Sequence, residues 1–317
     1  MVKNKNLHAA RNKKNDEFYT QFLDIWKELN NYKDFFNGKV VYCNCNDTME
    51  SNFFKFFKIN FKRFGLKKLI TIGYKKDGHG VAFVYDGNKN RNSKVDDSEV
   101  KVIKLKGNGG YETEECIAFL KEADVVVTNP PFSLFRDYVK QLMDYNKKFL
   151  IIGNNNAITY KEIFQYIQNN ELWLGFSVNK TMKFQLSDIC EKFDEIDKNG
   201  KKYGKVSAIT WFTNIPNNKR NQPLDLCCKY NPTDYPKYDN YNAINVDKVM
   251  DIPEDYDGVM GVPITFLGKY CDTQFEIVGW SRHNDLGMSG GYWQGGKKGA
   301  TINGKQVYRR ILIKRIK

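Results

Sequence analysis

The chain has 317 residues, of which 41% are hydrophobic and 15% aromatic, and its formal net charge is +13. This length provides a sizeable core for one large or two ordinary domains, while no apolar run reaches the length of a membrane span. The odd number of irregularly spaced cysteines argues against a disulfide framework, and three histidines without a CxxC pair argue against a zinc site, so we expect a cytoplasmic protein with no membrane partner and no metal.

In chain order, the first half of the sequence alternates predicted strands with predicted helices. Strands are predicted at residues 39–45, 67–73, 99–107, 124–129 and 148–154, and helices at 49–65, 113–123, 133–146 and 159–170. This alternation indicates a parallel sheet with helices on both faces. Apart from Asp124, the runs DVVV (124–127) and FLII (149–152) are apolar, as expected of strands that are covered on both sides. Such sheets bind ligands at the carboxyl ends of their strands.

The pattern changes after residue 170. The segments LWLGFSV (172–178) and SAITWFTNI (207–215) are predicted strands without a helix between them, which suits an antiparallel hairpin that finishes the sheet. From Pro216 onward the chain is rich in turns, tyrosines and lysines, and only short strands are predicted. We therefore expect a large domain over residues 1–215 and a smaller one over residues 216–317.

The sequence NPPF (129–132) follows the predicted strand DVVVT directly. Two prolines can simply end a strand, and asparagine is a common turn residue. The position of the motif between a buried strand and a helix favours a functional turn instead. Because proline restrains the residue before it to an extended conformation, Asn129 is held in place. Pro130 has no N–H, so no donor competes with its carbonyl oxygen.

These four residues suit chemistry on a planar exocyclic amine. The amide oxygen of Asn129 and the carbonyl of Pro130 are two fixed acceptors for the two hydrogens of such an amine. They favour its pyramidal form and stabilise the positive charge that develops as a methyl group arrives, which is worth about 3 kcal/mol of barrier per group. Phe132 offers a flat face on which a base can stack, worth about 1–3 kcal/mol.

Several separated motifs, in the same order along the chain, resemble one family. NPPF after DVVVT resembles the catalytic motif of amino-methyltransferases that use S-adenosylmethionine, and NDEFYTQ (15–21) resembles their N-terminal cofactor motif. Together with VVYCNCNDTMESNFFKFF (40–57), ITWFTN (209–214), GVPITFLGKY (261–270) and QFEIVGW (274–280), they resemble the EcoRI-like adenine-specific DNA methyltransferases. The fold that the resemblance implies is an α/β Rossmann-like methyltransferase sheet with a smaller C-terminal DNA-recognition region.

The resemblance also implies roles for individual residues. Asn129, Pro130 and Phe132 would be catalytic. The cofactor S-adenosylmethionine would contact Phe18, Tyr19, Thr20, Asn44, Asp47, Asn52, Tyr111 and Asn129. Trp211 or Phe212 would line the pocket that holds the target base. The chain departs from the general pattern of such enzymes in three ways. No glycine-rich turn follows the first strand, and residues 74–76, after the second strand, contain no acid for the cofactor ribose. After the third strand, no acid precedes the aromatic residue Tyr111.

The partner that the resemblance implies is double-stranded DNA, in which the target adenine is rotated out of the stack at a cost of a few kcal/mol. The five Lys/Arg without an acid in residues 1–14, and the eight after Asp285, fit a polyanion partner, although a solvated basic surface would show the same bias. Phosphates would be held by NNKR (217–220) and by the C-terminal tail, and the loop at 179–184 would lie near the substrate. The candidates for reading guanine are Arg220, Arg282, Arg309 and Arg310.

Two further readings of the function stay open on the sequence. The same motif would serve an RNA adenine, a cytosine N4 or a glutamine amide, because all of them offer a planar amine. A non-catalytic nucleic-acid-binding module is the reading that the missing glycine-rich turn favours. A partner restriction endonuclease is possible, as a functional and not necessarily physical partner.

Overall fold

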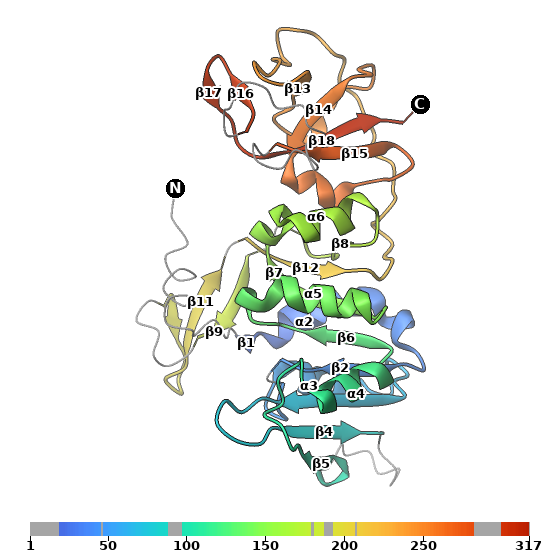
Figure 1. The fold of residues 1–317 in the computed structure, drawn as a ribbon, viewed down its shortest axis with the longest axis vertical. Coiled ribbons are helices and arrows are strands. Elements are labelled where there is room, and N and C mark those ends of the chain that lie inside the picture. Colours follow the sequence, from blue (N-terminus) through green and yellow to red (C-terminus); the bar gives the residue numbers. More distant parts are fainter. Residues whose placement is uncertain are drawn as a thin grey trace. The chain divides into compact units, whose positions relative to one another are not determined.

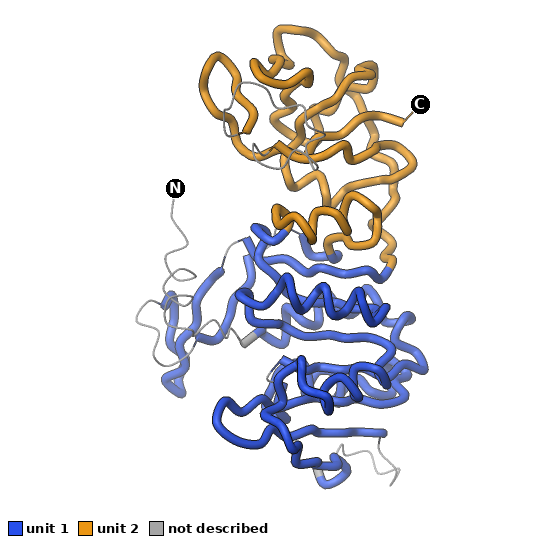
Figure 2. Tube along the Cα trace, viewed as in Figure 1, with its two compact units in different colours: residues 1–157, 175–215 blue, residues 158–174, 216–317 orange. Residues whose placement is uncertain are grey.

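The structure is a computed structural model, and it describes residues 19–45, 47–87, 97–178, 181–186, 193–206, 208–281 and 299–316. The chain divides into two compact units, shown in different colours in Figure 2. Unit 1 comprises residues 1–157 and 175–215, and unit 2 comprises residues 158–174 and 216–317. The boundary after Ile215 coincides with the position where the sequence changes character, whereas the assignment of residues 158–174 to unit 2 differs from the sequence prediction.

A large mixed sheet forms the centre of unit 1 (Figure 1). Its strands in this unit follow the order β5-β4-β3-β2-β6-β7-β12. The strands β3, β2, β6 and β7 run parallel to one another, while β4, β5 and β12 are antiparallel to their neighbours. Their bounds are β2 (Val40–Cys43), β3 (Lys68–Gly73), β4 (Val81–Tyr85), β5 (Lys101–Lys104), β6 (Val125–Thr128), β7 (Lys148–Asn154) and β12 (Ile209–Thr213). The predicted Rossmann-like α/β sheet is confirmed.

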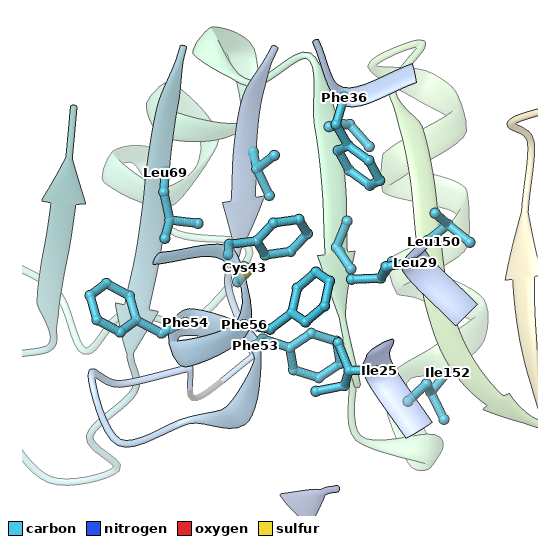
Figure 3. Packing of buried hydrophobic residues seen from close by; sticks show 14 of the residues in the cluster. Ile25, Leu29, Phe36, Cys43, Phe53, Phe54, Phe56, Leu69, Leu150 and Ile152 are labelled. Atoms are coloured by element: carbon cyan, nitrogen blue, oxygen red, sulfur yellow. The ribbon is translucent and has the colours of Figure 1, made fainter. Parts of the chain in front are cut away.

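Helices cover both faces of this sheet, because successive residues of each buried strand point to opposite sides. On one face, Phe53 and Phe56 pack with Leu150 and Ile152 in one hydrophobic cluster (Figure 3). On the other face, rings pair across the layers, as Tyr42 does with Phe119. The helices of unit 1 are α2 (Phe22–Leu29), α3 (Asn52–Ile59), α4 (Glu114–Glu122) and α5 (Phe135–Asp144), with 3-10 turns η1 (Asn30–Phe36), η2 (Asp97–Glu99) and η3 (Phe132–Leu134).

A second, small sheet belongs to unit 1, with the order β1-β9-β11-β10 and only antiparallel pairs. Its strands are β1 (Tyr19–Thr20), β9 (Met182–Gln185), β10 (Glu195–Ile196) and β11 (Lys202–Val206). Tyr19 pairs with Gln185 and Thr20 pairs with Phe184, so this sheet joins the described part of the N-terminal motif to the described part of the segment predicted to lie near the substrate. Two candidate regions that the sequence treated separately are therefore neighbours.

Unit 2 contains a four-stranded sheet in the order β13-β14-β18-β15 and a hairpin of β16 and β17. The helix α6 joins this unit because Gln168, at its end, donates hydrogen bonds from Nε2 to the carbonyls of Ile277 (3.2 Å) and Val278 (3.1 Å). Nearby, Asn170 Nδ2 donates to Asp272 Oδ2 at 2.7 Å. The elements are α6 (Lys161–Gln168), β8 (Trp173–Leu174), β13 (Ala243–Asn245), η5 (Val249–Asp251), β14 (Val259–Pro263), η6 (Ile264–Lys269), β15 (Phe275–Trp280), β16 (Thr301–Ile302), β17 (Lys305–Gln306) and β18 (Arg310–Arg315), while η4 (Asn155–Thr159) precedes α6.

Within the part of the chain that the structure describes, no helix has the length and apolar character needed to span a membrane. Over the same residues, no group of three or more His, Cys, Asp or Glu side chains is arranged to hold a metal ion.

Candidate active site

The loop after β2 and the turn after β6 meet at the carboxyl edge of the parallel strands. Thr128, the last residue of β6, donates a hydrogen bond from its hydroxyl to Oδ2 of Asp47 at 2.7 Å. The backbone N–H of Asp47 donates to the carbonyl of Ile72 in β3 at 2.8 Å. Asp47 therefore connects the ends of three strands, and Thr128 is bonded directly to Asn129 of the NPPF motif. The structure thus brings the predicted cofactor loop beside the predicted catalytic turn.

Asp47 is a buried carboxyl group, with 5% of its surface exposed. Burial raises the pKa of Asp47 to about 7, against the opposing effect of hydrogen bonds from Thr128, Ser51 and the backbone of Cys45. Ser51 also caps α3, because its Oγ accepts a hydrogen bond from Phe54 N at 3.0 Å. The carboxyl group is thus surrounded by donors from its own loop and from β6.

Asn44 lies at the end of β2 and is almost completely buried, with 2% of its surface exposed. Its Oδ1 accepts a hydrogen bond from the hydroxyl of Tyr138 in α5. Burial holds the pKa of Tyr138 well above its usual range, so its hydroxyl stays protonated and serves as a donor. The ring of Tyr111 meets the ring of Tyr138 edge-on at 5.2 Å, and Tyr111 is half-buried. Tyr111 is therefore held beside the loop and keeps part of its surface in solvent.

Asn52, at the start of α3, donates a hydrogen bond from Nδ2 to the carbonyl of Thr20 at 2.8 Å. Thr20 is buried and forms part of β1. This contact fixes the N-terminal motif against the helix that follows the β2 loop. Phe18 and the side chain of Tyr19 lie outside the described residues. Of the predicted cofactor residues, Thr20, Asn44, Asp47 and Asn52 are therefore placed by contacts within the protein.

The NPPF turn itself combines buried and accessible groups. Pro130 is buried, and Asn129 and Phe132 are half-buried. The Oδ1 atom of Asn129 is shielded from solvent, and Phe132 packs against the main hydrophobic cluster of unit 1 while it opens η3. Leu134 N donates to the carbonyl of Pro131 at 2.9 Å, which turns the chain toward α5. The turn is thus anchored at both ends.

The expectation that Trp211 or Phe212 lines a pocket for the target base is wrong. Both residues are fully buried in β12. They point to opposite faces of the sheet, where the ring of Trp211 meets Phe53 at 6.2 Å and the ring of Phe212 meets Phe135 at 4.9 Å. Burial on both faces makes them core residues, because a strand inside the sheet has no solvent-facing side.

Three of the candidate arginines are among the described residues, and two of these, Arg220 and Arg310, are half-buried through contacts within unit 2. Arg220 lies 3.8 Å above the ring of Trp173 and donates to Oδ1 of Asn170. Arg310 donates to Asp247 Oδ1 at 3.2 Å, and its side chain is only 12% exposed.

Arg309, by contrast, is exposed. It donates to Thr159 Oγ1 at 3.2 Å. Arg282 lies outside the described residues.

Thr128, Tyr138 and Ser51 belong to this site but were not predicted from the sequence. Thr128 was adjacent to the motif, and a polar residue at the end of an apolar strand was an available signal. Tyr138 had no such signal, because its contact with Asn44 joins residues 94 positions apart.

The NPPF turn at the carboxyl edge of a parallel sheet, beside a polar loop from the first strand, identifies a Rossmann-like methyltransferase. A family model described as the adenine-specific methyltransferase EcoRI matches residues 6–316. The chain belongs to this family, as its motifs predicted, and it is an adenine-specific DNA methyltransferase.

Relatives across nearly the whole chain agree with this assignment. The chain is 45% identical to the type II methyltransferase M.EcoRI of Escherichia coli, over 98% of this chain and 96% of the relative. It is 40% identical to the type II methyltransferase M.MgeORF184P of Mycoplasma genitalium, over 97% and 98% of the two chains. It is 42% identical to the type II methyltransferase M.MpnI of Mycoplasma pneumoniae, over 86% and 84%.

Proposed function

We propose that the protein transfers a methyl group from S-adenosylmethionine to N6 of an adenine that is rotated out of duplex DNA. The observation that carries this proposal is the position of the NPPF turn, which is tied through Thr128 to the loop that follows β2. Family membership supplies the adenine specificity, and the geometry supports the assignment of roles to the residues around the turn.

The residues at this edge fit a nucleoside-type cofactor. Tyr111 is half-buried and presents an aromatic ring, on which an adenine can stack. Ligands of parallel sheets bind outside the carboxyl ends of the strands, where the loops after β2, β3 and β6 converge here. Thr20, Tyr111 and Asn129 would contact S-adenosylmethionine, together with Phe18 and Tyr19. Asn44, Asp47 and Asn52 would hold the surrounding segments in place. The cofactor supplies an electrophilic methyl group on a sulfonium centre.

The protein's own part in the reaction is electrostatic. Asn129 Oδ1 and the carbonyl of Pro130 would accept hydrogen bonds from the adenine amine, and Phe132 would stack on the base. Acceptors fixed before the reaction stabilise the charge that develops on N6, since they need no reorganisation as it forms. The mechanism requires no covalent nucleophile from the chain.

The decisive experiment measures the product as well as the transfer. Purified protein, duplex DNA and S-adenosylmethionine with a labelled methyl group should yield labelled DNA, and mass spectrometry of the nucleosides should show N6-methyladenine. Labelled N4-methylcytosine, or label in RNA and not in DNA, would contradict the proposal. Binding of DNA without binding of S-adenosylmethionine in calorimetry would favour a non-catalytic module.

We further propose that residues 216–317 hold the DNA and that a restriction endonuclease of the same specificity is the functional partner. The relatives named above are type II methyltransferases, which supports a site-specific modification. DNA from cells that express the chain should become resistant to a nuclease that cuts at the methylated site. Methylated adenines scattered without a common sequence context would contradict site specificity.

Two adjacent arginines of unit 2 should give different phenotypes. Arg309→Ala should weaken DNA binding and reduce the slope of log K against log salt by about 1, because one exposed cation is removed. Arg310→Ala should instead lower the melting temperature, since Asp247 and Asn245 lose their shared partner. Filter binding at several salt concentrations and thermal unfolding check the pair. An unchanged salt slope in Arg309→Ala would exclude a phosphate contact at this position.

A further inference from the structure

We propose that Asp47 and Thr128 form a positioning pair, in which Asp47 fixes the catalytic turn through Thr128 instead of acting on a bound molecule. The inference rests on the proposed function, because it assigns a role in the same reaction. It also changes the role that the sequence predicted for Asp47, which was direct contact with the cofactor.

Thr128 connects Asp47 directly to the catalytic turn. Thr128 is fully buried and is paired in register with Ile151 of β7, so its backbone is part of the sheet. Its hydroxyl donates to Asp47, and its backbone continues into Asn129. A shift of this side chain would therefore pass directly to the residue whose amide oxygen must meet the adenine amine.

The environment of the Asp47 carboxyl group also favours a supporting role. It is enclosed by donors from Thr128, Ser51 and the backbone of Cys45, and its own backbone N–H is held by β3. A carboxylate loses solvation when it is buried, and donors of this kind offset that loss. A group that is 5% exposed and already satisfied in this way has little capacity left for a ligand. The position of Asp47 suits a structural role in which it holds the β2 loop, β3 and β6 together.

The pair should also make methyl transfer depend on pH. Three ionisable groups among the described residues interact electrostatically with Asp47, namely Cys43 in β2, Cys45 in the loop and Tyr138 in α5. Burial raises the pKa of each of these three groups, so they stay neutral near pH 7. The Asp47 carboxyl, with its pKa raised to about 7, is the group of this set that titrates in the neutral range. Its ionised form is the better acceptor for Thr128, so we expect methyl transfer to fall as the pH drops below 7.

The test compares Thr128→Val with Thr128→Ser. Valine has the shape of threonine without the hydroxyl, while serine keeps the donor. Thr128→Val should lower the single-turnover rate constant of methyl transfer by about 10- to 100-fold, the range expected for loss of an orienting contact. Thr128→Ser, which keeps the hydroxyl, should have a rate constant within about threefold of wild type. The dissociation constant of S-adenosylmethionine, measured by calorimetry, should change less than about threefold in both variants.

The pH profile gives a readout that a merely structural role would not move. Without the hydroxyl, the ionisation of Asp47 no longer acts on the catalytic turn, so the acid limb of the profile near pH 7 should be lost in Thr128→Val. Thr210→Val is the matched control, because Thr210 is also a fully buried threonine of the same sheet, in β12. This control should retain the rate constant and the pH profile of wild type.

The outcomes distinguish failure of the positioning role from failure of the proposed function. A wild-type rate constant in Thr128→Val, or a loss of cofactor affinity as large as the loss of rate, would overturn the positioning role. If Thr210→Val lost as much activity as Thr128→Val, general disruption of the sheet would explain the effect and the pair would be rejected. A wild-type protein that transfers no methyl group to DNA would refute the proposed function instead.

Discussion

Asn129→Ala is expected to lower the rate constant of methyl transfer by about 10²–10³-fold while the protein remains folded. The substitution removes one of two fixed acceptors for the adenine amine, and loss of a single preorganised group of this kind costs about 3–4 kcal/mol of barrier. Asn129 lies in a turn after β6 and is half-buried, so truncation leaves the sheet intact. Single-turnover transfer of a labelled methyl group to duplex DNA measures the effect.

A matched control is Asn169→Ala, which truncates an exposed asparagine at the C-terminal end of α6. Its rate constant should stay within about twofold of wild type. Melting curves of both variants show whether the fold survives. An Asn129→Ala protein that keeps at least a third of the wild-type rate would refute the catalytic role of this side chain and, with it, the proposed geometry of the amine.

The largest expected effect on stability comes from Glu28. This glutamate of α2 is fully buried, and its carboxylate accepts hydrogen bonds from the backbone N–H groups of Phe176 (2.6 Å) and Ser177 (2.7 Å). Glu28→Ala leaves both donors without their acceptor, so the free energy of unfolding should fall by about 3 kcal/mol. Denaturant unfolding of wild type and variant measures the difference.

The control for Glu28 is Glu50→Ala, because Glu50 pairs with Lys55 on the surface and its side chain is 89% exposed. That substitution should change the free energy of unfolding by less than about 0.5 kcal/mol. Equal effects of the two substitutions on the free energy of unfolding would show that the buried contacts of Glu28 stabilise the protein no more than a surface ion pair does.

The stability effect at Glu28 should also depend on pH. Burial raises the pKa of Glu28 above its ordinary value of 4.5. A raised folded-state pKa means that stability is fully present below 4.5 and is lost as the pH rises through the folded-state pKa. The difference in stability between wild type and Glu28→Gln should therefore become smaller as the pH rises above 4.5. A difference that grows over this range would contradict the sign of the shift.

Much of unit 1 was predictable because its signals are local. The runs at β2, β3, β6 and β7 are apolar strands of ordinary length, and α4 and α5 follow from helical periodicity. β4 was not predicted, because its five residues lie between glycines and charged residues and only two of them are buried. It is a strand because β3 and β5 pair with it on either side.

The sequence by itself determined the class of fold, the family and the residues of the NPPF turn, since these depend on apolar periodicity and on motifs of neighbouring residues. Only the tertiary structure decided which polar residues support the turn and which lie in the core. Thr128 and Asp47 are 81 positions apart, and Trp211 became a core residue because α3 covers it with Phe53. Contacts of this kind depend on how distant strands and helices pack, which a local pattern of residues does not specify.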